Sequence, residues 1–397
     1  MFSAEENDIL TEVGPDTLMG DLLRRYWTPA CLTAELPEPG GAPVRVQLFG
    51  ENLVAFRDTR GRVGLVQEHC PHRGASLFFG RNEDAALRCV YHGWAFDVNG
   101  RCVDVPSEPA PFCATVRMRA YPVHESGGIG WAYLGPRDSM TPFRDFGTEG
   151  LAAFEFTATK QLIACNWVQA MESNLDPAHI SHLHRLDTID SLPDDGSDKP
   201  GYPSNVMSWR FSLHDRRPRL ELQDTWYGYR YAGVRTTPNG YTHVQVTAYA
   251  VPYSTMVAKI PFSVGHTMFV PADDGHCWRY SVAPRQPLNP RGLGGASVLT
   301  GAMEQRSQLF MVTESLGPNY DRTQEQLGST DRAITRMRRI LIAAARGLAS
   351  GDEPPAVGGD LDYESIRGAE KILEPGEDWR VLGTDDDPVV REAYCMD

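Results

Sequence analysis

Two cysteines and two histidines stand in two short groups between residues 70 and 92. Cys70-x-His72 forms the first group and Cys89-x2-His92 the second, within the stretch CPHRGASLFFGRNEDAALRCVYHGW. Two thiolates and two imidazoles can hold a structural zinc ion in a closed tetrahedron. They can also hold a [2Fe-2S] cluster in which two imidazoles replace two thiolates on one iron, which raises the reduction potential. The residue types alone leave both chemistries open.

The spacing of these four residues favours the iron-sulfur cluster. Zinc sites with two cysteines and two histidines usually pair like with like, whereas each short group here supplies one thiolate and one imidazole. Two facing β-hairpin loops would then give each iron one ligand from each loop. Gly74 and Gly93 follow the histidines where the backbone must turn tightly, and Pro71 stiffens the first loop.

A second group of possible metal ligands lies in NWVQAMESNLDPAHISHLH, residues 166–184. Asp176, His179 and His184 form Asp-x2-His-x4-His, and neutral imidazole suits Fe(II). On a regular helix the two histidines would stand about 140° apart, so the segment must kink or unwind for both to reach one metal. His182 fits no position of this pattern and is interpreted as a surface histidine.

The elements that carry the first group have the alternation of β-strands. The runs VRVQLFG, ENLVAFRD, RVGLVQ and WAFDVNGRCVDVP lie between residues 44 and 136. Asn99-Gly100 separates two alternating segments and predicts a type I′ hairpin turn. A small β domain of stacked hairpins is expected.

The pattern changes after a proline-containing crossing at residues 140–146. A helical stretch is expected near residues 165–183 and strand-like runs from 202 to 282, and residues 185–203 have the composition of a long mobile loop. An amphipathic helix opens at Ser329-Thr330-Asp331. Its predicted buried face carries Ile334, Met337, Leu341, Ala344 and Leu348. The sequence thus predicts two domains, 1–145 and a mixed α and β domain at 146–397.

Composition excludes several classes of function. The chain of 397 residues carries a net charge of -14 with no basic cluster, so neither nucleic acid nor an anionic membrane is expected as a partner. The N-terminus lacks the features of a signal peptide, and there is no apolar run of about 18 residues. Eight cysteines are too sparse for a disulfide framework, so reduced thiols and a cytoplasmic protein are expected.

The first group and its setting, VAFRDTRGRVGLVQEHCPHRGASLFFGRNE, resemble a known family. The family they resemble is the oxygenase (alpha) component of the Rieske non-haem iron aromatic-ring-hydroxylating oxygenases, of the phthalate dioxygenase type. The resemblance implies an α+β protein: an N-terminal all-β Rieske [2Fe-2S] domain, then a catalytic domain with a helix-grip antiparallel sheet and helices. It further implies that Cys70 and Cys89 hold one iron, and that His72 and His92 hold the other.

The same resemblance assigns roles in the second group. His179 and His184 match the histidines of the mononuclear Fe(II) site. Asp176 matches an aspartate that hydrogen-bonds an iron-ligating histidine and, across a subunit boundary, a Rieske histidine of the next protomer. Asn166 matches the asparagine of an Asn-Trp pair near the iron.

The third ligand of the mononuclear site is missing from its expected position. The stretch TESLGPNYDRTQEQLGSTDRAITRMRRILIAAAR, residues 313–346, resembles the family's C-terminal block, which follows a Gln-Asp pair whose aspartate completes the 2-His-1-carboxylate site. Counting from either side places Gln308 at the glutamine and Leu309 at the aspartate.

Four explanations compete for this departure. Glu304 or Glu314 could supply the carboxylate in a shifted register, or solvent could complete the site. The open position could admit an anion such as chloride and turn the reaction to halogenation or another non-standard oxidation. The chain could also be a Rieske electron-transfer or partner subunit without oxygen chemistry. Ordinary oxygenation is the leading hypothesis, because an electron carrier needs neither a second domain nor Asp-x2-His-x4-His.

The resemblance also implies partners and a substrate class. An NADH-dependent flavin and iron-sulfur reductase would supply electrons, and O2 would be used to hydroxylate, dihydroxylate or dealkylate a small aromatic or cyclic substrate. Because electrons cross between protomers, a closed trimer or a stacked pair of trimers is expected. Arg185, Arg230 and Arg235 are candidates to bind a substrate carboxylate.

Overall fold

A computed structural model describes nine stretches of the chain: 2–110, 112–145, 156–183, 199–200, 207–257, 262–263, 265–284, 305–357 and 362–393. Its described helices are α1 (Ala4–Thr11), α2 (Leu18–Leu23), α3 (Trp167–Leu175), α4 (Met207–His214), α5 (Gln305–Ser315), α6 (Arg332–Ala349) and α7 (Pro388–Ala393). None of these helices is long and apolar enough to cross a membrane.

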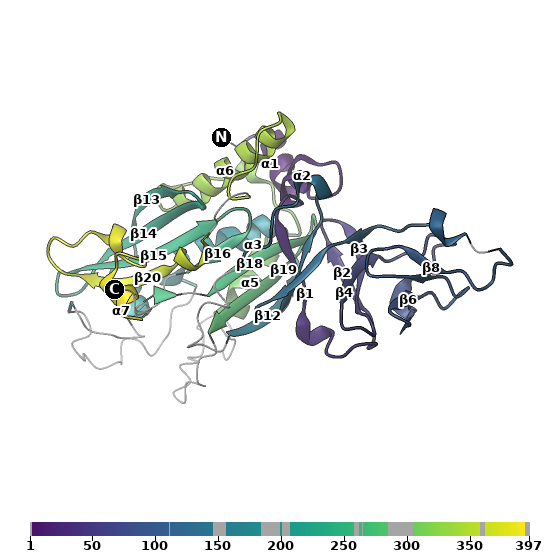
Figure 1. The fold of residues 1–397 in the computed structure, drawn as a ribbon. Helices are drawn as coiled ribbons and strands as arrows, with labels where there is room; N and C mark the ends of the chain where they lie inside the picture. The colour runs from purple at the N-terminus through teal and green to yellow at the C-terminus, as the bar shows by residue number, and fades with distance from the viewer. Residues whose placement is uncertain are drawn as a thin grey trace.

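Three small antiparallel sheets form one end of the molecule, on the right in Figure 1. Their orders are β1-β11-β10, β2-β3-β4-β9 and β5-β6-β7-β8. The strands are β1 (Trp27–Leu32), β2 (Val44–Leu48), β3 (Glu51–Arg57), β4 (Val63–Gln67), β5 (Arg81–Glu83), β6 (Ala86–Arg88), β7 (Ala95–Phe96), β8 (Cys102–Asp104), β9 (Ala120–Tyr121), β10 (Val123–Ser126) and β11 (Ile129–Tyr133). The predicted runs at 44–50, 51–58 and 62–67 become β2, β3 and β4, which pair in sequence as hairpins.

The turn at Asn99-Gly100 differs from the predicted type I′ turn. A type I′ turn needs positive φ at both central residues, and only Gly100 has it, at 72°. The Asp97 carboxylate instead accepts hydrogen bonds from the backbone N–H groups of Asn99 and Arg101, both at 2.9 Å. This side-chain contact favours a longer turn, in which Gly100 alone takes the left-handed conformation.

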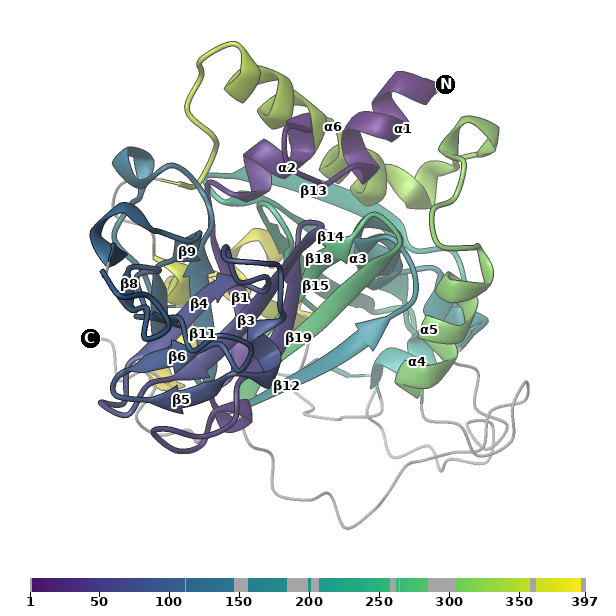
Figure 2. The same ribbon diagram turned by 90° about the vertical axis from the view of Figure 1, so that its right-hand side faces the viewer.

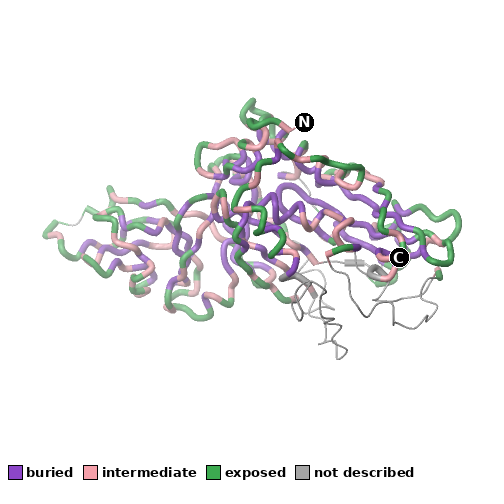
Figure 3. The backbone as a smooth tube through the Cα atoms, turned by 180° about the vertical axis from the view of Figure 1, so that it is seen from behind, coloured by how far each residue is buried: buried purple, intermediate pink, exposed green. Residues whose placement is uncertain are grey.

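A nine-stranded antiparallel sheet is the centre of the second domain. Its main order is β12-β19-β18-β16-β15-β14-β13, and β20 pairs with both β15 and β17. The strands are β12 (Phe156–Ile163), β13 (Arg219–Thr225), β14 (Gly228–Thr236), β15 (Thr242–Ala250), β16 (Ser254–Met256), β17 (Phe262–Ser263), β18 (His266–Asp273), β19 (His276–Pro284) and β20 (Gly368–Leu373). Figure 3 shows much buried chain in this domain, and most residues of β14, β15, β16 and β18 are buried.

Helices cover the face of this sheet that carries the candidate site. α3 packs against β16, β18 and β19, α6 packs against β13 and β14, and α3 and α6 contact one another. The opposite face of β14 and β15 packs against the C-terminal segment through Trp379 and Leu382. The site is thus built between a sheet and its covering helices.

The N-terminal helices lie with the second domain. α1 and α2 both pack against α6, as Figure 2 shows, although they precede the strands of the first domain. Residues 4–23 therefore stabilise the helical layer of the second domain, while the predicted division at residue 145 groups them with the first.

Two helical predictions are confirmed, and one helix was not predicted. The break expected near residues 165–183 is present, because α3 ends before Asp176 and a 3-10 helix, η5 (His179–Ser181), follows Pro177. The helix opening at Ser329-Thr330-Asp331 is α6, with Ile334, Met337 and Leu341 buried. Strand-like runs were expected throughout 202–282, but residues 207–214 form α4. The predicted loop at 185–203 lies outside the described residues except for 199–200.

Candidate functional site

Two loops of nearly identical backbone design present the first group of side chains. The first connects β4 to β5, and the second connects β6 to β7. In each loop a glycine N–H donates to the carbonyl of the cysteine four residues earlier, from Gly74 to Cys70 at 2.9 Å and from Gly93 to Cys89 at 3.0 Å. Both glycines have left-handed φ, 76° and 77°. The tight turns expected after the histidines are confirmed.

The loops bring like side chains together across the gap between them. The Cys70 and Cys89 thiols form a buried, hydrogen-bonded pair, and burial with a smaller contribution from Cys89 raises the pKa of Cys70 to about 11. The His72 and His92 rings lie 4.5 Å apart, centroid to centroid. The buried Nδ1 of His72 has no hydrogen-bond partner, while the face of that ring stacks on Trp94 at 4.4 Å.

These positions fit a two-iron cluster better than a single zinc ion. Two thiols on one side and two imidazoles on the other match a cluster with two protein ligands on each iron. The unpaired Nδ1 of His72 is a nitrogen that can coordinate an iron of such a cluster.

The second group lies where α3 ends. The backbone N–H of Ala178 donates to Asp176 Oδ1 at 2.7 Å, and Asp176 Oδ2 is 3.7 Å from His179 Nδ1. Burial alone would raise the pKa of Asp176, but the contacts with His179 and with backbone N–H groups outweigh it and lower that pKa below its ordinary value. The ionised form of Asp176 is therefore favoured, and its carboxylate faces Nδ1 of His179 at a separation longer than a hydrogen bond. His184 lies outside the described residues.

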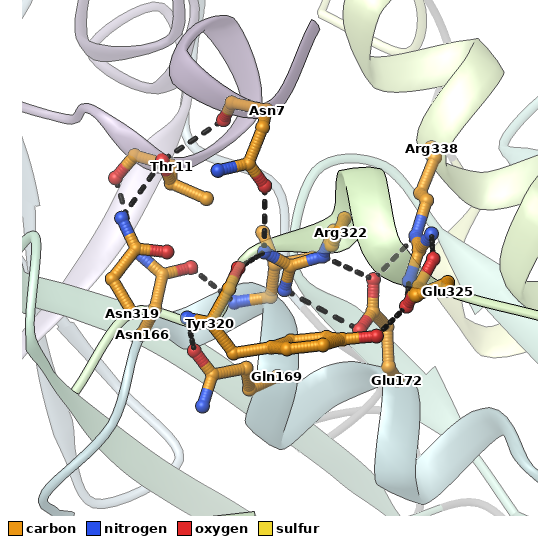
Figure 4. A network of polar contacts seen from close by, with 11 residues as sticks. Asn7, Thr11, Asn166, Gln169, Glu172, Asn319, Tyr320, Arg322, Glu325 and Arg338 are labelled. Atoms are coloured by element: carbon orange, nitrogen blue, oxygen red, sulfur yellow. Dashed lines mark hydrogen bonds and ion pairs between the residues drawn. The ribbon is translucent and has the colours of Figure 1, made fainter. Parts of the chain in front are cut away.

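A buried ionic network fixes α3 from the side of α6 (Figure 4). Glu172 of α3 binds Arg338 of α6 at 2.6 Å and Arg322 at 3.3 Å. Arg338 also binds Glu325, at 2.8 Å. Both arginine side chains are almost completely buried, so their charges are neutralised by these carboxylates inside the protein.

Asn166, predicted to lie near the mononuclear iron, has a structural role at the start of α3. It is the N-cap of α3, and its Nδ2 donates to the carbonyls of Thr11 at 3.0 Å and Asp274 at 2.7 Å. Asp176 is at the other end of this helix, about 15 Å away at the rise of an α-helix. The side chain of Asn166 begins the helix and connects it to the N-terminal segment.

Leu309 is half-buried on α5, the helix that packs against α3. It is followed by buried Phe310, whose ring lies 5.9 Å from the guanidinium of Arg279. Glu314, predicted as an alternative carboxylate, has a backbone partner away from Asp176. It is exposed and accepts a hydrogen bond from the backbone N–H of Ala164 at 2.9 Å, beside the start of α3 and not its end. Glu304 lies outside the described residues.

The candidate substrate arginines are structural where they are described. Arg230 is buried and donates to the carbonyl of Leu382 at 3.0 Å and to Gln223 at 2.8 Å, so it faces the C-terminal segment. Arg235 is also buried and donates to the carbonyl of Pro177 at 2.7 Å. Arg185 lies outside the described residues. Arg230 and Arg235 are therefore engaged with backbone oxygens of the protein itself.

Tyr231 contacts the site but was not singled out in the sequence. Its hydroxyl donates to the carbonyl of Leu175 at 2.9 Å. The alternation of β14 places it on the same face as Arg235, four residues later. That alternation could have paired the two residues, but nothing in the sequence indicates that they face the end of α3.

Comparisons with known proteins identify the class. Residues 26–122 match the Rieske [2Fe-2S] domain family, and residues 132–291 and 288–394 match the family described as LigXa C-terminal domain like. The phthalate 4,5-dioxygenase oxygenase subunit of Pseudomonas putida is 34% identical over 438 residues, covering 99% of this chain and 98% of the relative. The chain belongs to the Rieske non-haem iron oxygenases, as an oxygenase component of the phthalate dioxygenase type.

Other similar proteins agree with this membership. The oxygenase subunit of tert-butanol monooxygenase / tert-amyl alcohol desaturase from Aquincola tertiaricarbonis is 39% identical over 397 residues, covering 91% of this chain and 81% of the relative. The crystal structure of dicamba monooxygenase bound to dicamba has the same fold, with a TM-score of 0.63 and 20% identity over 83% of this chain and 99% of that chain. The predicted α+β fold class is confirmed, and the cofactors of the family are a Rieske [2Fe-2S] cluster and mononuclear non-haem iron.

Proposed function

We propose that this chain is a terminal oxygenase in which Cys70, His72, Cys89 and His92 hold the Rieske cluster, and His179 and His184 hold the mononuclear iron. The observation that carries the proposal is the pairing of two thiols and two imidazoles across two matched loops, with His72 and His92 4.5 Å apart. The Asp176–His179 contact of 3.7 Å at the end of α3 supports the second site.

The cysteines, the histidines and Asp176 have different roles in this proposal. The cluster supplies single electrons when bound, and the mononuclear iron supplies O2 activation. The two buried cysteines keep their end of the cluster away from water, and the two histidines present the other end toward the surface. Asp176 orients His179, and about a quarter of its own side chain is exposed, so a neighbouring protomer can contact it.

The finer assignments follow from the same proposal. Electrons come from NADH through a flavin and iron-sulfur reductase, and the substrate is a small aromatic or cyclic molecule that is hydroxylated, dihydroxylated or dealkylated. The oxygenase works as a trimer or a pair of trimers in the cytoplasm. The described cysteines form no disulfides, as expected in a reducing compartment. The functional division falls near residue 145.

A second candidate function rests on Leu309. An apolar side chain on α5, where the family has a carboxylate, leaves a coordination position that solvent or an anion such as chloride can take. Such a site would support halogenation or another non-standard oxidation. The same residue is the argument for a partner subunit that transfers electrons without oxygen chemistry.

Oxygen incorporation tests the proposal. The full chain is supplied with a flavin and iron-sulfur reductase, NADH, labelled 18O2 and three probes: phthalate, 3-chlorobenzoate and tert-butanol. We expect labelled product with the wild-type chain and with His182→Ala, which changes an exposed histidine outside the motif, and none with His179→Ala. Reduction of the cluster without any O2 consumption beyond that of the reductase alone would instead identify an electron-transfer subunit.

A further inference from the structure

The backbone on both sides of Asp176 is held by two side chains from one strand. The hydroxyl of Tyr231 donates to the carbonyl of Leu175 at 2.9 Å, and Nη2 of Arg235 donates to the carbonyl of Pro177 at 2.7 Å. Tyr231 is 3% exposed and Arg235 is 1% exposed. The carbonyls of Leu175, before Asp176, and of Pro177, after it, are therefore fixed by buried donors on the same face of β14.

These carbonyls need such donors because the helix ends here. The last carbonyls of an α-helix have no partners within the helix, and Pro177 has no N–H with which to continue the ladder. A buried carbonyl without a partner is costly, so the donors stabilise an irregular backbone that would otherwise rearrange. The sequence Asp-Pro-Ala-His can then keep a single conformation inside the protein.

Arg235 connects this turn to two further elements. It donates to Gln245 Oε1 on β15 at 2.8 Å and to the carbonyl of Asp215 after α4 at 3.2 Å. Among the described residues its three hydrogen-bond acceptors are neutral oxygens. Burial lowers the pKa of Arg235, and the charges of Asp215, Glu370 and Asp176 act against that effect. α4 also contacts η5, the short helix that carries His179.

We infer that Tyr231 and Arg235 are positioning residues for Asp176, acting through the carbonyls of Leu175 and Pro177. Asp176 uses Oδ1 for the Ala178 N–H and turns Oδ2 toward His179 Nδ1. With the backbone fixed on both sides, the carboxylate keeps one orientation toward His179 and toward the protomer boundary. The inference rests on the proposed role of Asp176 and assigns to β14 the task of keeping that residue in place.

The same strand offers matched controls. Tyr229 is buried and donates its hydroxyl to the carbonyl of Ala333 on α6 at 2.7 Å, and buried Arg230 donates to the carbonyl of Leu382 at 3.0 Å. Each control removes the same kind of bond, from a tyrosine or an arginine to a backbone carbonyl. Neither bond involves the turn that carries Asp176.

The test compares Tyr231→Phe and Arg235→Lys with Tyr229→Phe and Arg230→Lys in the full chain with its Rieske cluster. Lysine keeps the charge of Arg235 but cannot reproduce its fork of donors. The Fe(II) dissociation constant is measured by anaerobic titration, and the nitrosyl adduct is examined by EPR. We expect the site variants to weaken Fe(II) binding about 10-fold, the scale for partners that orient a ligand, and to broaden the nitrosyl signal. The controls should stay within about two-fold.

Hydrogen exchange in the iron-free chain gives a readout that needs no mononuclear iron. Amides of the peptide 175–183 should exchange faster in Tyr231→Phe and Arg235→Lys than in the wild type, and at the wild-type rate in the two controls. Equal Fe(II) affinity, nitrosyl spectrum and exchange in site and control variants would overturn the inference. A wild-type chain that binds no mononuclear iron would overturn the proposed function, while the exchange comparison would still decide whether β14 fixes the turn.

Discussion

Leu309 is the residue that most affects the chemistry expected at the mononuclear site. Leu309→Asp restores a carboxylate where the family carries one, on the α5 helix that packs against α3. We expect Fe(II) affinity to rise at least about 10-fold, since a direct ligand should exceed the effect of an orienting partner. The measurement is anaerobic Fe(II) titration, followed by product analysis.

Leu309→Asn is the control for this substitution, because it has the shape of aspartate without its charge. It should bind Fe(II) more weakly than Leu309→Asp. If the parent, the Asp variant and the Asn variant have the same iron affinity and give the same product, then residue 309 does not face the metal. The open-site hypothesis would then be wrong.

His266 should make the stability of the second domain depend on pH. It is 2% exposed, and burial lowers its pKa from 6.5 to about 4, against the smaller opposing effect of Asp145. Protonation therefore favours the unfolded chain. The contribution of neutral His266 to the free energy of unfolding is fully present above pH 6.5 and is lost as the pH falls toward 4. The loss is at most about 3 kcal/mol, given the size of the pKa shift.

The check is the free energy of unfolding in urea as a function of pH. His266→Gln removes the titrating group while keeping a polar side chain near Ser254, which lies 3.2 Å from His266 Nδ1. The slope of stability between pH 6.5 and 4 should be smaller in this variant than in the wild type. Equal slopes would show that His266 is not the group responsible.

The residues that could be predicted from the sequence are those whose geometry is local. Cys70-x-His72 and Cys89-x2-His92 sit in turns closed within five residues, so spacing and glycines were sufficient. The N-cap role of Asn166 was not predicted, because its partners, Thr11 and Asp274, are more than 100 residues away in sequence. Arg235 was only a candidate substrate ligand, because nothing in the sequence shows that its donors reach the carbonyl of Pro177 in the turn after α3.

At the scale of elements, α3 is held in place by charge as well as by packing. Glu172→Gln leaves Arg322 buried without its carboxylate partner and removes one of the two partners of Arg338. Removing one member of a buried ion pair typically costs about 3 to 5 kcal/mol. We expect a loss of about 3 kcal/mol in the free energy of unfolding, because Glu325 still pairs with Arg338.

Asp224→Asn is the matched control. Asp224 pairs with Arg336 at 2.9 Å, but Asp224 is largely exposed and Arg336 is only half-buried. The corresponding loss should be below about 1 kcal/mol. Urea unfolding of both variants measures the difference, and equal losses would show that the network in Figure 4 does not hold α3.

Element types followed from the sequence where periodicity was strong. β2 alternates, β3 and β4 are short runs of mostly buried residues, and α6 has a marked apolar face. α4 was missed because MSWRFSLH is a single short amphipathic stretch among strands, without a clear capping signal. The break after α3 was predicted from the angle between two histidines, and the structure supplies its cause in Pro177.

At the scale of the whole molecule, the candidate cluster site and the candidate mononuclear iron site lie in different parts of one chain. In Figure 1 β6, which leads into the second cluster loop, lies toward one end of the molecule, and α3 lies near its middle. Asp176 is partly exposed, and His72 and His92 are only half-buried. Electron transfer is therefore expected between protomers, from the cluster of one to the iron of the next.

This arrangement predicts the mass of the particle. Light scattering should give three times the 44.1 kDa of one chain, or six times if two trimers stack. Mixing a Cys70→Ser chain with an Asp176→Asn chain should restore part of the activity that each lacks, because intact residues then meet across a boundary. An active particle of 44.1 kDa would contradict the account.

The most direct measurement is total iron per chain after anaerobic Fe(II) reconstitution, with EPR of the nitrosyl adduct. The account predicts about three irons, two in the cluster and one mononuclear, and a high-spin nitrosyl signal that His179→Ala abolishes while the Rieske signal persists. About two irons, no nitrosyl signal and a normally reducible cluster would contradict it, and would leave a Rieske protein that transfers electrons without activating oxygen.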